Sequence, residues 1–198
     1  MHKDSMKKNL YVTDLVDLAE FDPRLQLDIR YAGTNNFCGQ AIYPEPCAWL
    51  QRPAAEALRQ AHDRARKEGY GFIVFDAYRP WHITRQFWEQ FPAYREFLAD
   101  PAAGSVHNRG CAVDLSLFQL DNGMAVDMPS AYDEFTKRAY PEFAGGTSKQ
   151  RELRDRLRAW MEAEGFAVHP HEWWHYNYKD WERYPVMDLE FAELRKPA

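Results

Sequence analysis

The sequence is poor in cysteine, and its three cysteines, Cys38, Cys47 and Cys111, show no CxxC spacing. An odd number of cysteines without that spacing makes neither a disulfide framework nor a thiolate zinc site. We therefore expect each cysteine to be a small buried side chain. The first residues carry charges with no apolar stretch after them, so we expect no secretory signal in this chain and a cytoplasmic location. The alternative is a mature periplasmic form whose signal has been removed.

Long hydrophobic runs and an excess of positive charge are also missing. The longest uncharged stretch is too short and too mixed to span a bilayer, so no membrane partner is expected. Lysine and arginine total 25 against 30 aspartate and glutamate residues, a formal net charge of −5. Nucleic-acid binding requires a basic face, so no nucleic-acid partner is expected. No GxGxxG, P-loop lysine or GxSxG motif occurs, and we expect neither a nucleotide cofactor nor serine-hydrolase chemistry.

The sequence does contain enough apolar material for one folded domain. Hydrophobic residues make up 45% of the 198 residues, and 7 Trp, 11 Tyr and 12 Phe supply a large aromatic surface. A composition of this kind argues against disorder. At roughly 100–200 residues per domain, the length predicts a single domain over residues 1–198, with loosely ordered tails at 1–10 and 190–198.

Hydrophobic periodicity and turn signals predict an α+β domain. Helices are predicted at Leu50–Glu68, at Trp81–Leu98 with an interruption at Pro92, and from a capping box at Thr147-x-x-Gln150 to Gly165. Strands are predicted at Tyr70–Phe75, Ala112–Phe118 and His169–Tyr178, and residues 121–146 are predicted to be mostly loop. The second of these strands alternates, with Val113, Leu115 and Leu117 on one face. Because these helices and strands interleave without regular βαβ units, we expect a central antiparallel sheet flanked by helices.

The first segment whose side chains could bind a metal ion or take part in catalysis runs from Ser105 to Asp114. It places His107 on a glycine-containing loop and Asp114 on the following strand, on the less apolar face beside Ser116. An unpaired buried carboxylate is costly, and a divalent metal ion shared with His107 would satisfy it. A hydrogen bond between histidine and aspartate would also satisfy it, and this segment alone favours that structural interpretation.

The second segment is Glu172-Trp-Trp-His175. A catalytic zinc ion has three protein ligands and an open position. His175 can supply the third ligand, and Glu172 can then act as a general base beside the ion. Residues i and i+3 of an ideal strand face opposite sides, so we expect a bend between Glu172 and His175. His169 and His171 are rival ligands, and spacing alone does not choose among the three histidines.

The third segment, Asp76-Ala-Tyr-Arg79-Pro80, directly follows a predicted strand. Pro80 imposes an extended conformation on Arg79. The guanidinium is permanently charged and forked, which suits a carboxylate, a phosphate or an oxyanion. A rigid position at the end of a core strand also suits a group that stabilises a transition state. A structural ion pair between Arg79 and Asp76 explains this segment equally well.

Two further histidines are assigned no chemistry. His62 lies on a charged face of its predicted helix, so we expect it to be solvated. His82 follows the Arg79-Pro80 turn, and we expect it to cap the next helix.

Together and in this order, the three segments resemble the D-alanyl-D-alanine dipeptidases of the VanX type, zinc peptidases of family M15 with the hedgehog/DD-peptidase fold. The resemblance covers nearly the whole chain. It begins at Asp28-Ile-Arg-Tyr31-Ala-Gly-Thr-Asn-Asn36-Phe37-Cys-Gly39 and continues through the three segments described above, ending at Tyr176.

The resemblance implies a zinc cofactor held by His107, Asp114 and His175, and so resolves the choice among the histidines. It also implies Glu172 as the general base and acid, and Arg79 as the residue that stabilises the oxyanion. The substrate-binding residues that it implies are Ser105 for the substrate carboxylate, Asp133 for the substrate ammonium group and Tyr31 as a pocket residue.

The implied activity is zinc-dependent hydrolysis of D-alanyl-D-alanine, or of a close D-containing dipeptide, to free amino acids. Such an enzyme could serve peptidoglycan recycling, D-alanine scavenging or vancomycin resistance, as a monomer or a homodimer. A D,D-carboxypeptidase or endopeptidase acting on longer cell-wall peptides is the alternative enzyme. A non-catalytic, zinc-stabilised binding module is a further alternative, but it should have lost Glu172 or Arg79, and this chain has both.

The chain departs from the family pattern at two places. The link at residues 99–104 is short where the best-known resistance enzymes have a longer loop that walls the pocket, so other dipeptides or larger side chains could enter. Asn108 stands where serine is common, a change that we expect to leave the chemistry unaltered.

Overall fold

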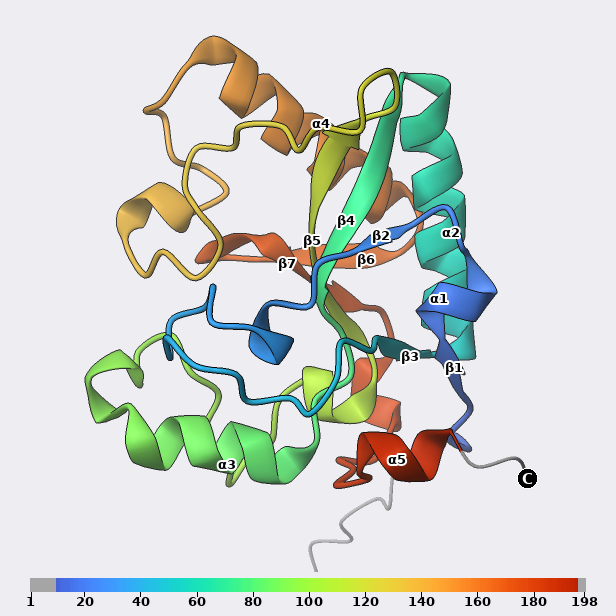
Figure 1. Cartoon of the computed structure of the whole chain (residues 1–198), viewed down its shortest axis with the longest axis vertical. Helices are drawn as coiled ribbons and strands as arrows, with labels where there is room; N and C mark the ends of the chain where they lie inside the picture. The colour runs from blue at the N-terminus through green and yellow to red at the C-terminus, as the bar shows by residue number, and fades with distance from the viewer. Residues whose placement is uncertain (1–9, 196–198) are drawn as a thin grey trace, which may run out of the picture.

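The structure is a computed structural model and describes residues 10–195. In this range the chain forms short and long helices around a central sheet (Figure 1). The strands are β1 (Leu15–Asp17), β2 (Gln26–Leu27), β3 (Trp49–Gln51), β4 (Tyr70–Asp76), β5 (Ala112–Gln119), β6 (Phe166–His169) and β7 (Glu172–Tyr178). The α-helices are α1 (Leu18–Phe21), α2 (Arg52–Lys67), α3 (Trp81–Gln90), α4 (Ser148–Ala163) and α5 (Phe191–Leu194).

The central sheet has the strand order β2-β4-β5-β7-β6. Its neighbours pair antiparallel, except that β2 pairs with β4 in parallel. The predicted α+β class is therefore confirmed, but the sheet is mixed and not wholly antiparallel. A parallel pair requires a crossover connection, which α2 supplies between β2 and β4. A second, two-stranded sheet of β1 and β3 is not predicted by the sequence.

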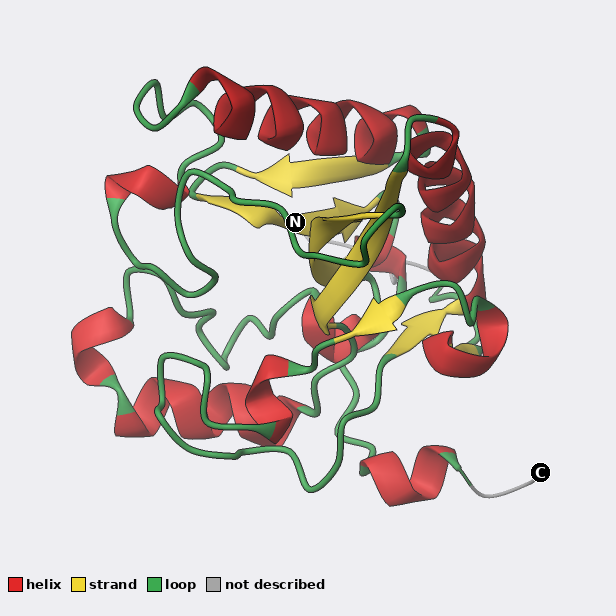
Figure 2. Ribbon diagram, turned by 45° about the horizontal axis from the view of Figure 1, so that its top comes forward, coloured by secondary structure: helices red, strands yellow, loops and turns green. Residues whose placement is uncertain are grey.

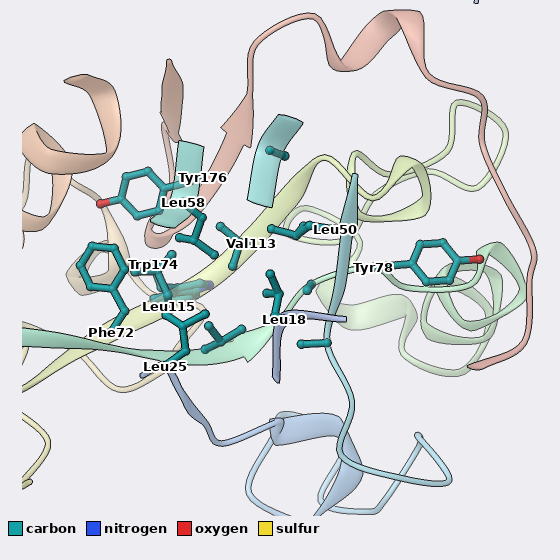
Figure 3. Close-up of a cluster of buried hydrophobic side chains, with 14 of the residues drawn as sticks. Leu18, Leu25, Leu50, Leu58, Phe72, Tyr78, Val113, Leu115, Trp174 and Tyr176 are labelled. Carbon is teal, nitrogen blue, oxygen red and sulfur yellow. The ribbon is translucent and has the colours of Figure 1, made fainter. Parts of the chain in front are cut away.

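The two long helices, α2 and α4, pack together and against one side of the sheet (Figure 2). The alternation predicted for β5 is confirmed on this side, because Val113, Leu115 and Leu117 are completely buried in the main core. Figure 3 shows Val113 and Leu115 in one cluster with Leu58 of α2. Since successive strand residues face opposite sides, Asp114 points to the side of the sheet away from the long helices.

All three predicted helices are present, and each is shorter than predicted, α3 by the most. α2 begins at Arg52 because Leu50 lies in β3 and pairs with Val16. α3 ends at Gln90, and a separate 3-10 turn begins at Pro92. A proline inside a helix removes a hydrogen bond and clashes with the preceding turn, which explains why the helix does not continue.

The third helix, α4, begins at the predicted capping box. The side-chain oxygen of Thr147 accepts a hydrogen bond from the backbone N–H of Gln150 (3.1 Å), and Gln150 Oε1 accepts one from the backbone N–H of Thr147 (2.8 Å). The preceding residues 121–146 contain one short 3-10 turn at Lys137–Ala139 and are otherwise loop, as predicted.

The strand predicted at His169–Tyr178 corresponds to β7, which begins at Glu172 and forms a hairpin with β6. The pairing register shifts at the end of β6, where two consecutive residues have Tyr176 and Glu172 as their partners. Regular pairing is therefore interrupted between Glu172 and His175, which confirms the predicted bend. The sequence misses β6, which has only four residues.

Part of the predicted C-terminal tail is folded. Residues 191–194 form α5, in which Phe191 is buried against the ring of Tyr43, with 4.9 Å between the ring centroids. Residues 1–9 and 196–198, which make up most of the rest of the predicted tails, lie outside the described residues.

The three cysteines are unpaired, as expected. Cys47 and Cys111 are buried and Cys38 is partly buried. In the described part of the chain, none of the helices combines the length and the apolar character that a membrane span requires.

His62 is completely buried and not solvated, so this prediction is wrong. Its Nδ1 lies 3.0 Å from Asp22 Oδ2, and its ring stacks on Phe72 with 5.1 Å between centroids. The partner carboxylate comes from a segment 40 residues away. The charge pattern of α2 alone cannot report such a distant covering segment. His82 also differs from its prediction, because its Nδ1 bonds Asp188 (2.6 Å) and does not cap α3.

We expect acidification to destabilise the protein through His62. Burial lowers the pKa of His62 below its ordinary value of 6.5, although Asp22 opposes this shift. As the pH falls below 6.5, the unfolded chain takes up a proton at His62 that the folded protein resists, so the free energy of unfolding decreases. Thermal unfolding at about pH 7 and pH 5 should show a larger loss of Tm in the wild type than in the variant His62→Gln. Parallel losses in the two proteins would contradict this prediction.

Candidate metal centre and active site

Arg79 lies just after the end of β4, where the chain leaves the central sheet. Its Nη2 and Nε lie 2.6 Å and 3.1 Å from Asp76 Oδ2, so the structural ion pair is present. Asp76 is completely buried and also accepts a hydrogen bond from the Tyr43 hydroxyl (2.8 Å). Arg79 nevertheless lines the cavity that contains the candidate metal ligands. The ion pair and a role in the site are therefore compatible.

His107 lies in a 3-10 turn, His107–Arg109, before β5. Its Nδ1 is 2.6 Å from the carbonyl oxygen of Ala77. Because a carbonyl only accepts hydrogen bonds, Nδ1 carries the proton and Nε2 presents its lone pair. The turn ends at Gly110 with a φ of 65°, and a Cβ atom there would lie 2.5 Å from the side chain of Leu15. Only glycine suits this position.

Asp114 and His175 are direct partners across β5 and β7. His175 Nδ1 lies 3.0 Å from Asp114 Oδ1. His107 Nε2 lies 3.4 Å from the same oxygen and 3.1 Å from His175 Nδ1. On their outer sides, His175 Nε2 donates to Asn177 Oδ1 (2.7 Å), and Asp114 Oδ2 accepts from the Tyr132 hydroxyl (2.9 Å). Each ligand candidate is thus held from outside, with its inner atom turned toward the other two.

These three inner atoms could hold a metal ion, and His107, Asp114 and His175 are called the metal group below. Ligand atoms about 2.0–2.2 Å from a tetrahedral zinc ion lie about 3.3–3.6 Å apart, close to the separations of 3.0, 3.1 and 3.4 Å found here. Asp114 Oδ1 is buried without a hydrogen-bond partner among the described residues, which is costly for a carboxylate. A histidine–aspartate hydrogen bond would need an additional proton on His107 or His175. The donor set therefore fits a cation better than it fits the structural interpretation.

Glu172 lies beside this group at the start of β7. Its Oε2 is 3.8 Å from His175 Nδ1, and its side chain is 13% exposed. Burial raises the pKa of Glu172 well above its ordinary value, and the negative charges of Asp114 and Asp133 add to this shift. A carboxylate with a raised pKa is a stronger base and can also donate a proton nearer to neutral pH.

His169 and His171 line the same cavity but lie outside the metal group. His169 Nδ1 accepts a hydrogen bond from the backbone N–H of His171 (3.3 Å) and is 4.0 Å from Glu172 Oε2. Burial and the neighbouring histidines lower the pKa of His169 to about 4, so it is neutral at pH 7. Of the three rival histidines, the structure brings His175 to Asp114.

Asp133 and Tyr31 are in contact with each other. Asp133 accepts hydrogen bonds from the Tyr31 hydroxyl (3.2 Å) and from the backbone N–H of Phe37 (3.3 Å). The φ of Asp133 is 58°, in the left-handed region that aspartate adopts more readily than most residues. Burial and the charge of Asp114 raise the pKa of Asp133 to about 7.

One cavity of about 390 Å³ connects all the site residues that the sequence predicts. They are Tyr31, Arg79, Ser105, His107, Asp114, Asp133, Glu172 and His175. The Ser105 side chain is buried, and its Oγ accepts a hydrogen bond from the backbone N–H of His107 (3.2 Å). Residues 96–99 form one wall, next to the short link that the sequence shows. A larger cavity of about 600 Å³, between residues 165 and 183, contains none of these eight residues.

Sequence reasoning misses the groups that hold the ligands from outside. Tyr132 precedes the predicted Asp133, but nothing in the sequence indicates that its hydroxyl reaches Asp114. Asn177 could have been found, because it is two residues after His175 and so lies on the same face of β7. The carbonyl of Ala77 has no sequence signal, because any residue would supply it.

Residues 11–194 match the M15 peptidase family described as D-ala-D-ala dipeptidase. The chain is 32% identical over 186 residues to the D-alanyl-D-alanine dipeptidase of Escherichia coli (strain K12), covering 94% of this chain and 95% of that protein. It is also 32% identical over 183 residues to the D-alanyl-D-alanine dipeptidase of Enterococcus faecium, covering 83% and 90%. Among solved structures, it resembles the LD-carboxypeptidase LdcB, with a TM-score of 0.49 and 20% identity, covering 88% of this chain and 73% of that one.

The family match spans almost all of the described residues, and both relatives align over nearly their whole length. These findings confirm the resemblance expected from the sequence. The chain belongs to the M15 peptidases, in the D-ala-D-ala dipeptidase family.

Proposed function

We propose that the protein is a zinc-dependent dipeptidase that hydrolyses D-alanyl-D-alanine, or a close D-containing dipeptide, to free amino acids. The observation that carries this proposal is the convergence of three metal-ligand atoms with Glu172 and Arg79 in one cavity. Membership of a family whose relatives are D-alanyl-D-alanine dipeptidases supports the choice of substrate.

His107, Asp114 and His175 would hold the zinc ion through Nε2, Oδ1 and Nδ1. When bound, zinc supplies Lewis-acid activation of a water molecule and of the scissile carbonyl group. The carbonyl of Ala77 and the amide of Asn177 fix the outer nitrogens of the two histidines. Such outer partners orient the imidazoles and raise their basicity as ligands.

Glu172 would move the proton in the reaction. As a carboxylate, it accepts a proton from the attacking water, and as the acid it donates that proton to the leaving amine. Its place 3.8 Å from His175 Nδ1 puts it next to the metal group without making it a ligand. Its raised pKa suits a group that must both accept and donate near neutral pH.

Arg79 would stabilise the negative charge that develops on the carbonyl oxygen. Asp76 binds Nε and Nη2 of the guanidinium. Because Arg79 also lines the cavity, its guanidinium can donate to the developing oxyanion. Because Asp76 already holds the guanidinium in place, little reorganisation is needed when the charge appears.

A dipeptide zwitterion needs one anionic and one cationic recognition point. Asp133 would bind the substrate ammonium group, and its hydrogen bond from Tyr31 would fix the position of its carboxylate. Ser105 would help to bind the substrate carboxylate. The short link at residues 99–104 would leave room for a side chain larger than that of alanine.

We also propose that the enzyme acts in the cytoplasm on a free dipeptide, as a monomer or homodimer without a nucleic-acid or membrane partner. Three unpaired cysteines fit a reducing compartment. The net charge of −5 is unfavourable for binding to nucleic acid.

The test is D-alanine release from D-Ala-D-Ala, with L-Ala-L-Ala, D-Ala-D-Phe and a pentapeptide ending in D-Ala-D-Ala assayed in parallel. Each substrate is assayed with the purified protein, after chelation of metal and after return of zinc. We expect zinc-dependent cleavage of the D,D-dipeptides and no cleavage of the other two substrates. Cleavage of the pentapeptide would favour the carboxypeptidase. Absence of cleavage by the stoichiometrically zinc-loaded protein would overturn the proposal.

A further inference from the structure

Asn108 is completely buried beside the metal group, in the turn that carries His107. Its side chain makes three hydrogen bonds. Oδ1 accepts from the backbone N–H of Ser105 (2.7 Å), and Nδ2 donates to the carbonyl oxygen of Arg79 (2.8 Å) and to Thr84 Oγ1 (2.8 Å). Both hydrogens of the amide nitrogen are thus used, and the amide oxygen has a donor.

The partners of Asn108 come from three separate segments of the chain, and of these partners Arg79 and Ser105 line the cavity whereas Thr84 does not. Arg79 follows β4, Thr84 belongs to α3, and Ser105 begins the loop that leads to the metal ligands. A further bond joins the same parts, because the backbone N–H of Arg79 donates to the carbonyl oxygen of His107 (3.2 Å). The backbone of Arg79 is therefore held from both its N–H and its carbonyl by the turn at His107 and Asn108.

The geometry points to Asn108 as a positioning residue that sets Arg79 and Ser105 relative to the metal ligands. This inference rests on the proposed function, because it assigns Asn108 a purpose in the dipeptidase reaction. Asn108 itself touches neither substrate nor metal ion in this role. It acts through the main chain of Arg79, whose guanidinium is held at its far end by Asp76.

The chemistry of the amide explains why this position is sensitive. Alanine at 108 would leave the Arg79 carbonyl and the Ser105 N–H buried without their partner, and buried polar groups relax toward any available partner or water. A serine hydroxyl has one hydrogen to donate, so it cannot donate to both Arg79 and Thr84. The sequence alone predicts that a change between asparagine and serine at position 108 leaves the chemistry unaltered. From these hydrogen bonds we instead expect the activity to depend on which of the two residues is present.

The experiment compares Asn108→Ala and Asn108→Ser with Thr84→Val in the zinc-loaded protein. Thr84→Val is the matched control, because valine has nearly the shape of threonine and removes one bond to Asn108. It leaves the bonds from Asn108 to Arg79 and Ser105 in place. The measurements are kcat and KM on D-Ala-D-Ala, zinc content, Tm and the affinity for a phosphinate analogue of D-Ala-D-Ala.

We expect Asn108→Ala to lower kcat/KM by about 10- to 100-fold at full zinc content, since a displacement of about 1 Å can cost 100-fold. The loss should fall mainly on kcat, and affinity for the phosphinate should fall by the same factor as kcat/KM. Asn108→Ser should lie between the alanine variant and the wild type. Thr84→Val should lose Tm but stay within about threefold of wild-type kcat/KM. A merely structural Asn108 would give equal activities in Asn108→Ala and Thr84→Val, and that result would overturn the inference.

A readout that needs no substrate separates this inference from the proposed function. In ¹H–¹⁵N NMR spectra, the Arg79 Nε–H signal should keep its wild-type position in Thr84→Val and shift or broaden in both Asn108 variants. An unchanged Arg79 signal in the Asn108 variants would overturn the inference even if the wild type cleaves D-Ala-D-Ala. If the wild type cleaves no dipeptide, the proposed function fails, and the Arg79 signal still decides whether Asn108 positions this residue.

Discussion

Replacing Glu172 by glutamine is expected to lower kcat for D-Ala-D-Ala hydrolysis by about 10²–10⁴-fold, the usual contribution of general acid–base catalysis. Glutamine has nearly the size and shape of glutamate, but it cannot take a proton from water at neutral pH. The change therefore removes proton transfer and little else. Zinc should remain bound, because Glu172 is not among the three residues whose atoms form the metal group.

The measurement is D-alanine release together with zinc content, for the wild type, Glu172→Gln and Glu89→Gln. Glu89 is a glutamate on α3 whose side chain is 65% exposed, so its replacement controls for the loss of one negative charge. Glu89→Gln should retain wild-type kcat, and both variants should bind zinc stoichiometrically. A Glu172→Gln enzyme with kcat within a few-fold of the wild type would remove Glu172 from its proposed role.

Alanine at His107, Asp114 or His175 is expected to abolish measurable turnover and to weaken zinc binding by more than about 100-fold. Loss of an outer partner of a ligand already costs 10- to 100-fold in metal affinity, and loss of a ligand itself should cost more. Competition with a chelator of known affinity measures this loss. The wild type should also gain stability from zinc, by about 2.7 kcal/mol when free zinc is 100 times its dissociation constant.

His169→Ala and His171→Ala are the matched controls for the ligand variants. Both histidines line the same cavity, yet the structure places neither in the metal group. We expect these two variants to bind zinc with wild-type affinity and to gain the same stability from it. If His169→Ala lost zinc and His175→Ala kept it, the ligand assignment would be wrong.

Local sequence patterns are enough to predict those helices and strands whose own residues contain a capping motif or a hydrophobic period. The capping box at Thr147 predicts the start of α4, and the alternation along β5 predicts which residues enter the core. β2 has no such signal, because two residues cannot show a period and the strand exists only through its pairing with β4. His62 fails for a related reason, since its partner Asp22 comes from a distant segment.

The same distinction applies to the site, where the residue types can be recognised in the sequence but the choice of ligand depends on contacts between distant segments. Residue types indicate a metal, but His169, His171 and His175 lie so close in sequence that spacing cannot select the ligand. The selection depends on the interruption of pairing in β7 and on the alignment of β7 with β5, both of which are tertiary features. The family resemblance supplied the expectation that spacing could not. The hydroxyl of Tyr132 and the amide of Asn177 become visible only with the side-chain geometry.

The direct pairing of Asp114 with His175 has a consequence for how the chain folds. A slip of one residue between β5 and β7 would turn one strand's side chains to the opposite face, so the two proposed ligands could no longer meet. A zinc ion held by both strands would bind only the correctly aligned sheet and would favour that alignment over its neighbours. The ion proposed for catalysis would then also act during folding, by stabilising the correct register of β5 and β7 over registers shifted by one residue.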